Sequence, residues 1–297
     1  MRVAISGQKG LIGQALANSL GRQNNEVLCL TRNPASANEV CWEPNRGILQ
    51  LEQIEQCSAV VHLAGENIAD GRWTEAKKQR IRDSRVAGTK NLCLSLAQLK
   101  QPPQVLVSAS AVGFYGNRGE EVLTEESEPG TGFFPEVCQA WESATRPAEE
   151  CGIRVVHLRI GVVLSATGGA LGKMLLPFRL GLGGRLGSGE QYMSWIALDD
   201  LISAIEFVLT ESTIVGPVNA TSPNPVKNKE FTSKLGSVLH RPTILPVPAF
   251  AMRLALGEMA DEALLSGARV MPSRLLAQGF RFNYPELEPA LSHYIGD

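Results

Sequence analysis

Three glycines near the start of the chain have a spacing that could bind phosphate groups. Gly7, Gly10 and Gly13 form a G-x-x-G-x-x-G pattern, directly after a short apolar strand and at the start of a helical pattern. Glycines in such a turn allow a tight bend, a close approach of the backbone to a pyrophosphate and close helix–strand packing. The helix N-terminus then presents free N–H groups to the phosphates. The pattern therefore predicts a dinucleotide site.

The end of the second predicted strand indicates which dinucleotide fits. An acidic side chain about 20 residues after the glycine turn would bind the ribose 2′-hydroxyl of NAD. This chain has Thr31 and Arg32 there, and the next acidic residue is Glu39. A guanidinium group is permanently charged, and its planar fork suits a phosphate. The sequence therefore favours NADP(H) over NAD(H), with a solvated loop arginine as the alternative.

The elements that must position these residues alternate between strand and helix. We predict strands over 3–6, 27–31, 59–64, 105–108, 155–158 and 217–220, and helices over 11–20, 73–96 and 201–209. Short, apolar strands that alternate with helices are typical of a parallel sheet with right-handed crossovers. The predicted fold class is therefore α/β, a Rossmann doubly wound parallel sheet.

The pattern changes after about residue 165, where glycines gather around an apolar run, and helical patterns return over 231–239 and 249–259. We expect residues 1–165, joined by 200–222, to form the dinucleotide-binding domain. Residues 166–199 and 223–297 would form a smaller substrate-binding lobe. Asp199 and Asp200 precede an apolar helical run, and we expect them to cap that helix.

Composition places the chain among ordinary soluble proteins. It is 44% apolar and 20% charged, with a net charge of −2, so no overall field attracts nucleic acid or an anionic membrane. No apolar run approaches the ~20 residues of a membrane helix, and because the first predicted strand follows Met1 directly we expect no targeting peptide. The six cysteines and four histidines are scattered. We therefore expect a cytoplasmic protein with reduced cysteines and no built-in metal site.

Several motifs resemble those of the extended short-chain dehydrogenase/reductase superfamily. Besides the glycine turn, they are His62-Leu63-Ala64-Gly65, residues 84–89, Ser108-Ala109-Ser110 with Tyr115-Gly116, and residues 195–200. Residues 63–68, 140–142, 161–164 and 177–184 are similar to an atypical branch, the NAD-dependent epimerase/dehydratase-like "epimerase family" proteins, sometimes described as cell-division inhibitor homologues. The resemblance covers nearly the whole chain. It implies an NADP(H)-binding extended fold with a C-terminal substrate lobe.

By position, the resemblance also implies which residues hold the cofactor. The glycine turn would line the pyrophosphate, the end of the second strand would hold the 2′-phosphate, and residues 63–65 would pass beside a ribose. Arg85 would reach back to the dinucleotide, unless it is a solvated charge on a basic helix face. The residues expected to bind the cofactor are Gly7, Gly10, Leu11, Ile12, Gly13, Thr31, Arg32, Leu63, Ala64, Gly65, Arg85 and Ser108.

The superfamily's usual catalytic motif is missing from this chain. Its members use a Ser or Thr with Tyr-x-x-x-Lys, in which the tyrosine transfers a proton and the lysine lowers the tyrosine pKa and holds the nicotinamide ribose. Ser110 is available here, but the tyrosine and lysine positions fall on Phe134 and Cys138. Phenylalanine has no proton to give, and a thiol supplies no fixed positive charge.

Three alternatives follow for the chemistry. Tyr115 could be a displaced proton donor, or only a packed aromatic at a turn. Glu136 or Cys138 could support a different reaction, or the protein could bind NADP(H) without turnover, as a sensor or scaffold. We predict an oxidoreductase or epimerase/dehydratase-like enzyme with Ser110 and Tyr115 as catalytic residues. Its substrate would be a small carbonyl or a sugar-nucleotide-like compound, and it could form a homodimer through the helix predicted over 73–96.

Overall fold

The chain folds around one large sheet. The computed structural model describes residues 1–296, and within them the main sheet has the strand order β12-β8-β6-β5-β1-β2-β3-β4. Neighbouring strands are parallel except for β3 and β4. The strands are β1 (Arg2–Ser6), β2 (Glu26–Thr31), β3 (Glu39–Glu43), β4 (Gly47–Ile48), β5 (Ala59–His62), β6 (Val105–Ala111), β8 (Arg154–Ile160) and β12 (Gly216–Ala220). This order runs outward from β1 in both directions, which confirms the predicted doubly wound Rossmann sheet.

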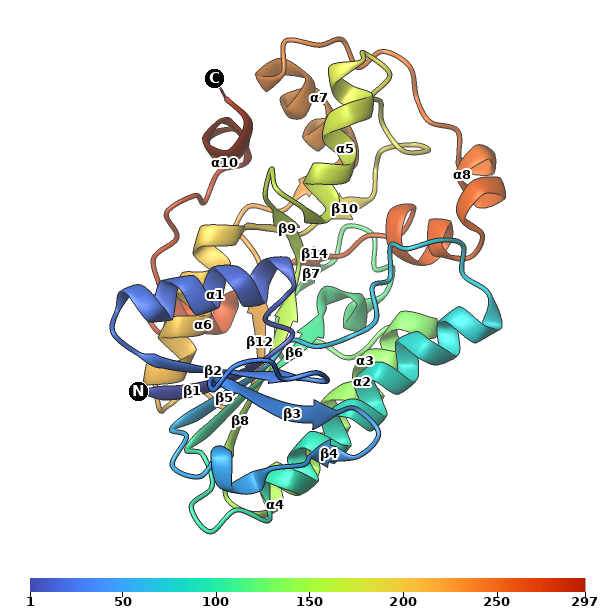
Figure 1. Cartoon of the computed structure of the whole chain (residues 1–297). Helices are drawn as coiled ribbons and strands as arrows, with labels where there is room; N and C mark the ends of the chain where they lie inside the picture. Colours follow the sequence, from blue (N-terminus) through green and yellow to red (C-terminus); the bar gives the residue numbers. More distant parts are fainter. Residues whose placement is uncertain (297) are drawn as a thin grey trace.

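Helices cover both faces of this sheet (Figure 1). On one face lie α1 (Leu11–Arg22) and α6 (Leu198–Thr210), and on the other lie α2 (Glu75–Leu96), α3 (Phe133–Ser143) and α4 (Arg146–Glu150). In strand β1, Val3 and Ile5 pack toward α1 and α6, whereas Ala4 packs toward α2. Both faces of the strand are buried, so the strand reads as a continuous apolar run.

Smaller elements form a lobe beyond the carboxyl ends of the strands. Strand β9 (Val162–Leu164) continues directly from β8 into this lobe and pairs with β11 (Trp195–Ala197). Two further strand pairs join β7 (Val122–Leu123) to β14 (Arg269–Val270) and β10 (Tyr192–Met193) to β13 (Val226–Lys227). The helices here are α5 (Gly169–Arg179), α7 (Asn228–Val238), α8 (Ala249–Leu256) and α10 (Leu287–Ile295), with the π-helical turn η3 (Ala260–Leu264) after α8. Helix α9 (Ser273–Ala277) instead packs beside β12 of the main sheet, and the short turns η1 (Leu51–Gln53) and η2 (Val112–Tyr115) lie elsewhere along the chain.

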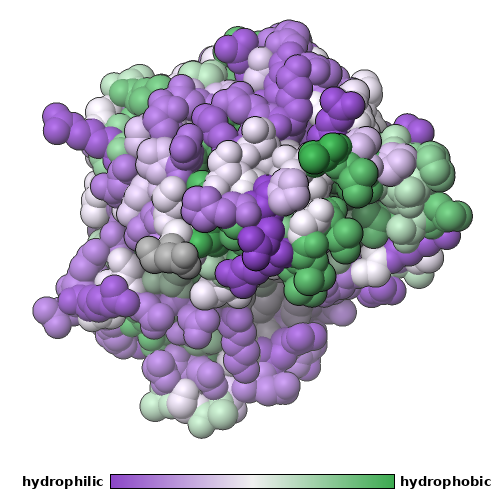
Figure 2. All heavy atoms as spheres, turned by 90° about the horizontal axis from the view of Figure 1, so that it is seen from above, coloured by the Kyte–Doolittle hydropathy of each residue, from purple (hydrophilic) through white to green (hydrophobic). Residues whose placement is uncertain are grey.

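The outer face of the lobe carries exposed apolar side chains. Ile244 is 85% exposed and Phe250 72% exposed, and Leu180, Leu182 and Leu254 are also well exposed. Figure 2 shows hydrophobic side chains gathered on one part of this face. None of the helices in the described residues has both the length and the apolar character that a membrane crossing requires.

The start of α6 corrects one expectation. The helix begins at Leu198 with Ala197 as its N-cap, so Asp199 and Asp200 lie inside its first turn and the predicted capping role is wrong. The buried Asp200 carboxylate accepts the backbone N–H groups of Asn283 at 2.7 Å and Tyr284 at 2.9 Å. It therefore ties the C-terminal segment to the main sheet layer, a role that only the tertiary structure reveals.

Candidate functional site

The β1–α1 turn is packed against the end of β5. Gly7 has a φ of +76°, and a Cβ placed on it would lie 2.9 Å from the Leu63 carbonyl carbon and the Ala64 nitrogen. A Cβ on Gly13 would lie 2.3 Å from the Gly7 carbonyl oxygen. Side chains are therefore excluded at both positions. Helix α1 begins after Gly10 without a side-chain cap on its first N–H groups and without an acidic residue in its first turn. Such an N-terminus favours an anionic group.

Ser6 fixes the segment that faces this turn. Its Oγ accepts the backbone N–H groups of Leu63 at 3.2 Å and Ala64 at 3.3 Å, and lies 2.6 Å from Nδ1 of His62. Ser6 and His62 have no exposed surface, and burial lowers the pKa of His62 to about 4. The imidazole is therefore neutral and orients the residues that the resemblance placed beside a ribose. Sequence analysis missed Ser6, although a serine that ends an otherwise apolar strand was a visible signal.

The end of β2 carries a positive charge close to the glycine turn. Strand β2 is the neighbour of β1 and ends at Thr31, so the exposed Arg32 follows at the same edge of the sheet as the glycine turn. Glu39 lies level with Cys29 in the β2–β3 register, and its carboxylate accepts the Ala35 N–H at 2.5 Å. Glu39 is thus held level with a residue two positions before the end of β2. An acid that contacts a ribose 2′-hydroxyl would have to lie at the end of that strand. The geometry fits a 2′-phosphate better than a free hydroxyl.

Arg85 and Ser108 also lie close to the carboxyl end of β5. The Arg85 guanidinium lies 3.4 Å from where a Cβ on Gly65 would be and donates to the carbonyl oxygens of Glu66 at 3.1 Å and Ile81 at 3.2 Å. The guanidinium thus packs against the end of β5, and burial there lowers the pKa of Arg85. The Ser108 hydroxyl is buried, and within residues 1–296 it has no hydrogen-bond partner.

A buried ion pair lies at the carboxyl ends of β6 and β8. Ser110 and Arg159 are partners in the β6–β8 register, and α3 places Glu142 against both. The Ser110 hydroxyl donates to Oε1 of Glu142 at 2.7 Å. Arg159 donates from Nε to Oε1 and from Nη2 to Oε2 of the same carboxylate, each at 2.8 Å. The side chains of Arg159 and Glu142 are 4% and 11% exposed. Sequence analysis named neither as a site residue.

Tyr115 lies behind this ion pair. Its hydroxyl donates to Oδ1 of Asn219 at 2.7 Å and accepts from Nη1 of Arg159 at 2.9 Å. The residue has no exposed surface, and burial raises the pKa of the phenol. Asn219 is itself held by the buried Glu125, which accepts its backbone N–H at 3.0 Å. In this arrangement Tyr115 contacts Ser110 only through Arg159 and Glu142.

The positions that usually hold the tyrosine and lysine are apolar in character. Phe134 packs on Gly113, with a Cβ on that glycine 3.3 Å from its own, and its ring lies edge-on to Trp73 at 5.0 Å. The Cys138 thiol is buried, and burial raises its pKa to about 12, so the thiol stays protonated and unreactive at neutral pH. Glu136 is exposed on α3. These features favour neither of the alternative chemistries proposed for Cys138 and Glu136.

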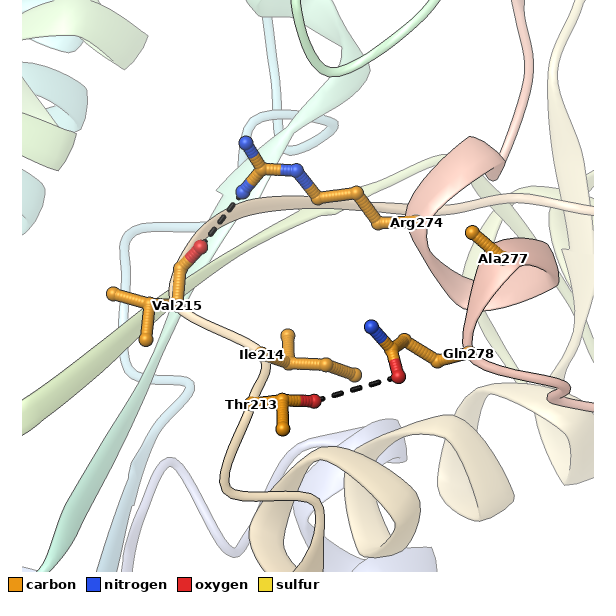
Figure 3. A pocket seen from close by; sticks show the side chains of 6 residues that line it. All are labelled: Thr213, Ile214, Val215, Arg274, Ala277 and Gln278. Carbon is orange, nitrogen blue, oxygen red and sulfur yellow. Dashed lines mark hydrogen bonds between the residues drawn. The ribbon is translucent and has the colours of Figure 1, made fainter.

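Two surface hollows lie away from the residues described above. One has a volume of ≈ 310 Å³ and lies beside the amino end of β12 (Figure 3). There Arg274 donates to the Val215 carbonyl at 2.7 Å, and Thr213 lies 3.4 Å from Gln278. The other, of ≈ 400 Å³, lies between α2 and the α3–α4 region. Ligands of doubly wound sheets bind at the carboxyl ends of the strands, so the carboxyl edge of the main sheet, which carries the glycine turn and Ser110, is the candidate site.

The fold and this site define a Rossmann-type protein of the extended short-chain dehydrogenase/reductase kind. Comparison with known proteins identifies a family. The family model described as "NAD dependent epimerase/dehydratase family" matches residues 3–219, and a domain of unknown function, DUF1731, matches residues 247–294. The chain belongs to the NAD dependent epimerase/dehydratase family, which confirms the resemblance stated from the motifs.

Individual relatives extend over the whole chain. The epimerase family protein MT2273 of Mycobacterium tuberculosis is 46% identical over 292 residues, which cover 98% of this chain and 96% of the relative. YfhF of Bacillus subtilis is 38% identical over 303 residues, covering 100% and 99%. The human epimerase family protein SDR39U1, solved with NADPH, superposes with a TM-score of 0.92 at 33% identity and full coverage of both chains. A UDP-glucose 4-epimerase from Thermus thermophilus, 18% identical with a TM-score of 0.74, shares the fold.

Proposed function

We propose that this chain binds NADP(H) and is an oxidoreductase or epimerase/dehydratase-like enzyme. One combination of three features carries the proposal. The start of α1 has no side-chain cap, and the turn before it has no room for a Cβ at Gly7 or Gly13. The neighbouring strand end carries Arg32 and not an acid. The first two features suit a pyrophosphate, and the third suits a 2′-phosphate. The NADPH found with human SDR39U1 supports the same cofactor.

The residues that would hold the cofactor come from four strand ends. Gly7, Gly10, Leu11, Ile12 and Gly13 would surround the pyrophosphate, and Thr31 with Arg32 would bind the 2′-phosphate. Leu63, Ala64 and Gly65 would pass beside a ribose, with Arg85 beneath them and Ser108 on the neighbouring strand. When bound, the nicotinamide would supply hydride chemistry at a substrate carbon.

Ser110 is the residue that we propose to contact the reacting oxygen of the substrate, because its hydroxyl lies at the carboxyl end of β6. Tyr115 is proposed to support the catalytic site indirectly, since its hydroxyl bonds to Arg159 and Asn219. The substrate would be a small carbonyl or hydroxyl compound, with a sugar nucleotide as one possible class. We further propose a cytoplasmic protein, divided into the domain and lobe predicted above, that does not bind nucleic acid or a membrane and that pairs through α2 as a homodimer.

A second candidate function is a non-catalytic NADP(H) sensor or scaffold. Phe134 and Cys138 support it, because neither can do the work of the tyrosine and lysine at those positions. This alternative requires the same cofactor site but no turnover on any substrate.

A paired nucleotide titration tests the proposed cofactor. Nucleotide-free protein is titrated with NADPH and NADH by following nicotinamide fluorescence, alongside Arg32→Ala and, as a control, Arg22→Ala at the other end of α1. We expect NADPH to bind more than about tenfold tighter than NADH, or ~1.4 kcal/mol. This preference should collapse in Arg32→Ala and persist in Arg22→Ala. Failure of the wild-type protein to bind either nucleotide would overturn the proposal.

A further inference from the structure

The Glu142–Arg159 ion pair is not explained by cofactor binding or by packing. Removing two charges from water is unfavourable, and a buried ion pair is weak grounds for stability. Both side chains are nonetheless nearly buried and lie at the carboxyl ends of the strands, where ligands of this fold class bind. Charged clusters in such positions are candidates for function.

The carboxylate and the hydroxyl are arranged for proton transfer. Ser110 Oγ donates to Oε1 of Glu142 at 2.7 Å, a well-formed hydroxyl hydrogen bond. Ser110 itself is 3% exposed and lies one residue before the end of β6. A substrate oxygen that contacts Ser110 at this edge of the sheet would therefore meet a hydroxyl that is already bonded to a carboxylate.

The guanidinium is fixed on all sides. Its Nε and Nη2 bond to Glu142 and its Nη1 bonds to Tyr115, and it stacks 3.5 Å from the Phe114 ring centroid. Although burial alone would lower the pKa of Arg159, the hydrogen bonds and charge of Glu142 raise it. Arg159 thus supplies the permanent positive charge that a lysine supplies in the usual motif. Each of its three nitrogens already donates to Glu142 or Tyr115.

We propose that Ser110, Glu142 and Arg159 replace the missing Tyr-x-x-x-Lys as the proton-transfer group of this site. The proposal rests on the proposed function. Ser110 contacts the substrate oxygen, Glu142 takes the proton from Ser110, and Arg159 is a positioning residue, supported from behind by Tyr115.

The step balances with the hydride transfer that the proposed function supplies. In the direction of alcohol oxidation, the substrate O–H bond breaks and its proton passes to Ser110 Oγ, while the original Ser110 proton passes to Oε1 of Glu142. The substrate carbon loses a hydride to the oxidised nicotinamide, and a carbonyl results. In the reverse direction the proton on Glu142 returns through Ser110 to the carbonyl oxygen.

The test measures cofactor affinity and turnover separately. The variants are Glu142→Gln, Glu142→Asp and Ser110→Ala, with the exposed Glu52→Gln as a control. The probe is 9,10-phenanthrenequinone, a reactive dicarbonyl, with NADPH as reductant. We expect Glu142→Gln and Ser110→Ala to bind NADPH within about twofold of wild type while kcat falls by about 10²-fold or more, the size of a general acid–base contribution. KM should change little, and Glu142→Asp should recover part of kcat.

Each other outcome has a defined meaning. Retention of more than half of kcat in Glu142→Gln would overturn the relay and leave the proposed function intact. NADPH binding without reduction of the quinone by wild type would overturn the relay and support the sensor alternative. Loss of NADPH binding by wild type would refute the proposed function itself. Where Glu142→Gln does not fold, the double variant Glu142→Gln/Arg159→Met, which leaves neither charge unpaired, takes its place with the same expected loss of kcat.

Discussion

Arg159 holds both carboxylate oxygens of Glu142, through Nε and Nη2 at 2.8 Å each, in a position that is almost closed to solvent. Each charged group is stabilised by the other, because water does not reach either group to replace its partner. The pair joins β8 to α3 beside Ser110, so it links the stability of the fold to the geometry of the site.

Breaking this pair from one side should be costly. Arg159→Met leaves the Glu142 carboxylate buried without its cation, and we expect the free energy of unfolding to fall by about 3–5 kcal/mol. The double variant Arg159→Met/Glu142→Gln removes both charges and should regain most of that loss. Urea unfolding followed by tryptophan fluorescence measures both. Equal losses in the single and double variants would show that packing, and not charge pairing, sets the effect.

The glycine turn should not tolerate a methyl group at its closest contact. Gly13→Ala would place a Cβ 2.3 Å from the Gly7 oxygen, and the forced shift should cost about 1–3 kcal/mol of stability and weaken NADPH binding more than tenfold. Gly21, in the same helix, has nothing within 4 Å of its Cβ position. Gly21→Ala should bind NADPH normally and gain up to about 1 kcal/mol from helix propensity. Calorimetric melting and nucleotide titration compare the two, and similar behaviour would contradict the packing argument.

Stability should fall with acid because of His62. Its folded-state pKa is about 4, below its usual 6.5, so between these values the unfolded chain binds a proton that the folded chain does not. Stability is therefore full above pH 6.5 and is lost as the pH falls toward 4, by up to about 3 kcal/mol. Burial lowers the pKa of His157 as well, with the same sign.

The His62 contribution is measured as a difference. Urea unfolding at several values between pH 7 and pH 4 should show a shallower decline for His62→Gln than for wild type. The exposed His240, replaced by Asn, serves as the control and should follow the wild-type curve. Parallel curves for wild type and His62→Gln would exclude the buried imidazole as a cause.

Cysteine labelling should distinguish buried from exposed thiols. Cys151 is exposed and Cys41 partly exposed, whereas Cys138 is buried with a pKa raised to about 12. Treatment of the native protein with iodoacetamide, read by peptide mass spectrometry, should modify Cys151 first and leave Cys138 unmodified until the chain is unfolded. Rapid native-state labelling of Cys138 would reopen its role as a reactive group.

Local patterns in the sequence were enough to predict the fold class and the family. Residues 3–5 are continuously apolar because both faces of β1 are buried, and the glycine spacing follows from contacts within one turn and with the end of β5. The glycine spacing depends on residues that are close together in the chain. The alternation of buried strands with helices recurs along the sequence, so it is also visible there. The predicted strands and helices of the Rossmann core were accordingly found close to their expected bounds.

Only the tertiary structure decided what surrounds Ser110. Glu142 and Arg159 are seventeen residues apart on a helix and a strand, and Tyr115 meets Asn219 across more than a hundred residues. No local pattern records such pairings, because they result from the register of β6 with β8 and the packing of α3 above them. The same holds for Asp200, whose sequence position suggested a helix cap but whose carboxylate binds the backbone of a distant segment. Long-range contacts of single polar side chains leave no period in the sequence, whereas the burial of whole strands and helices does.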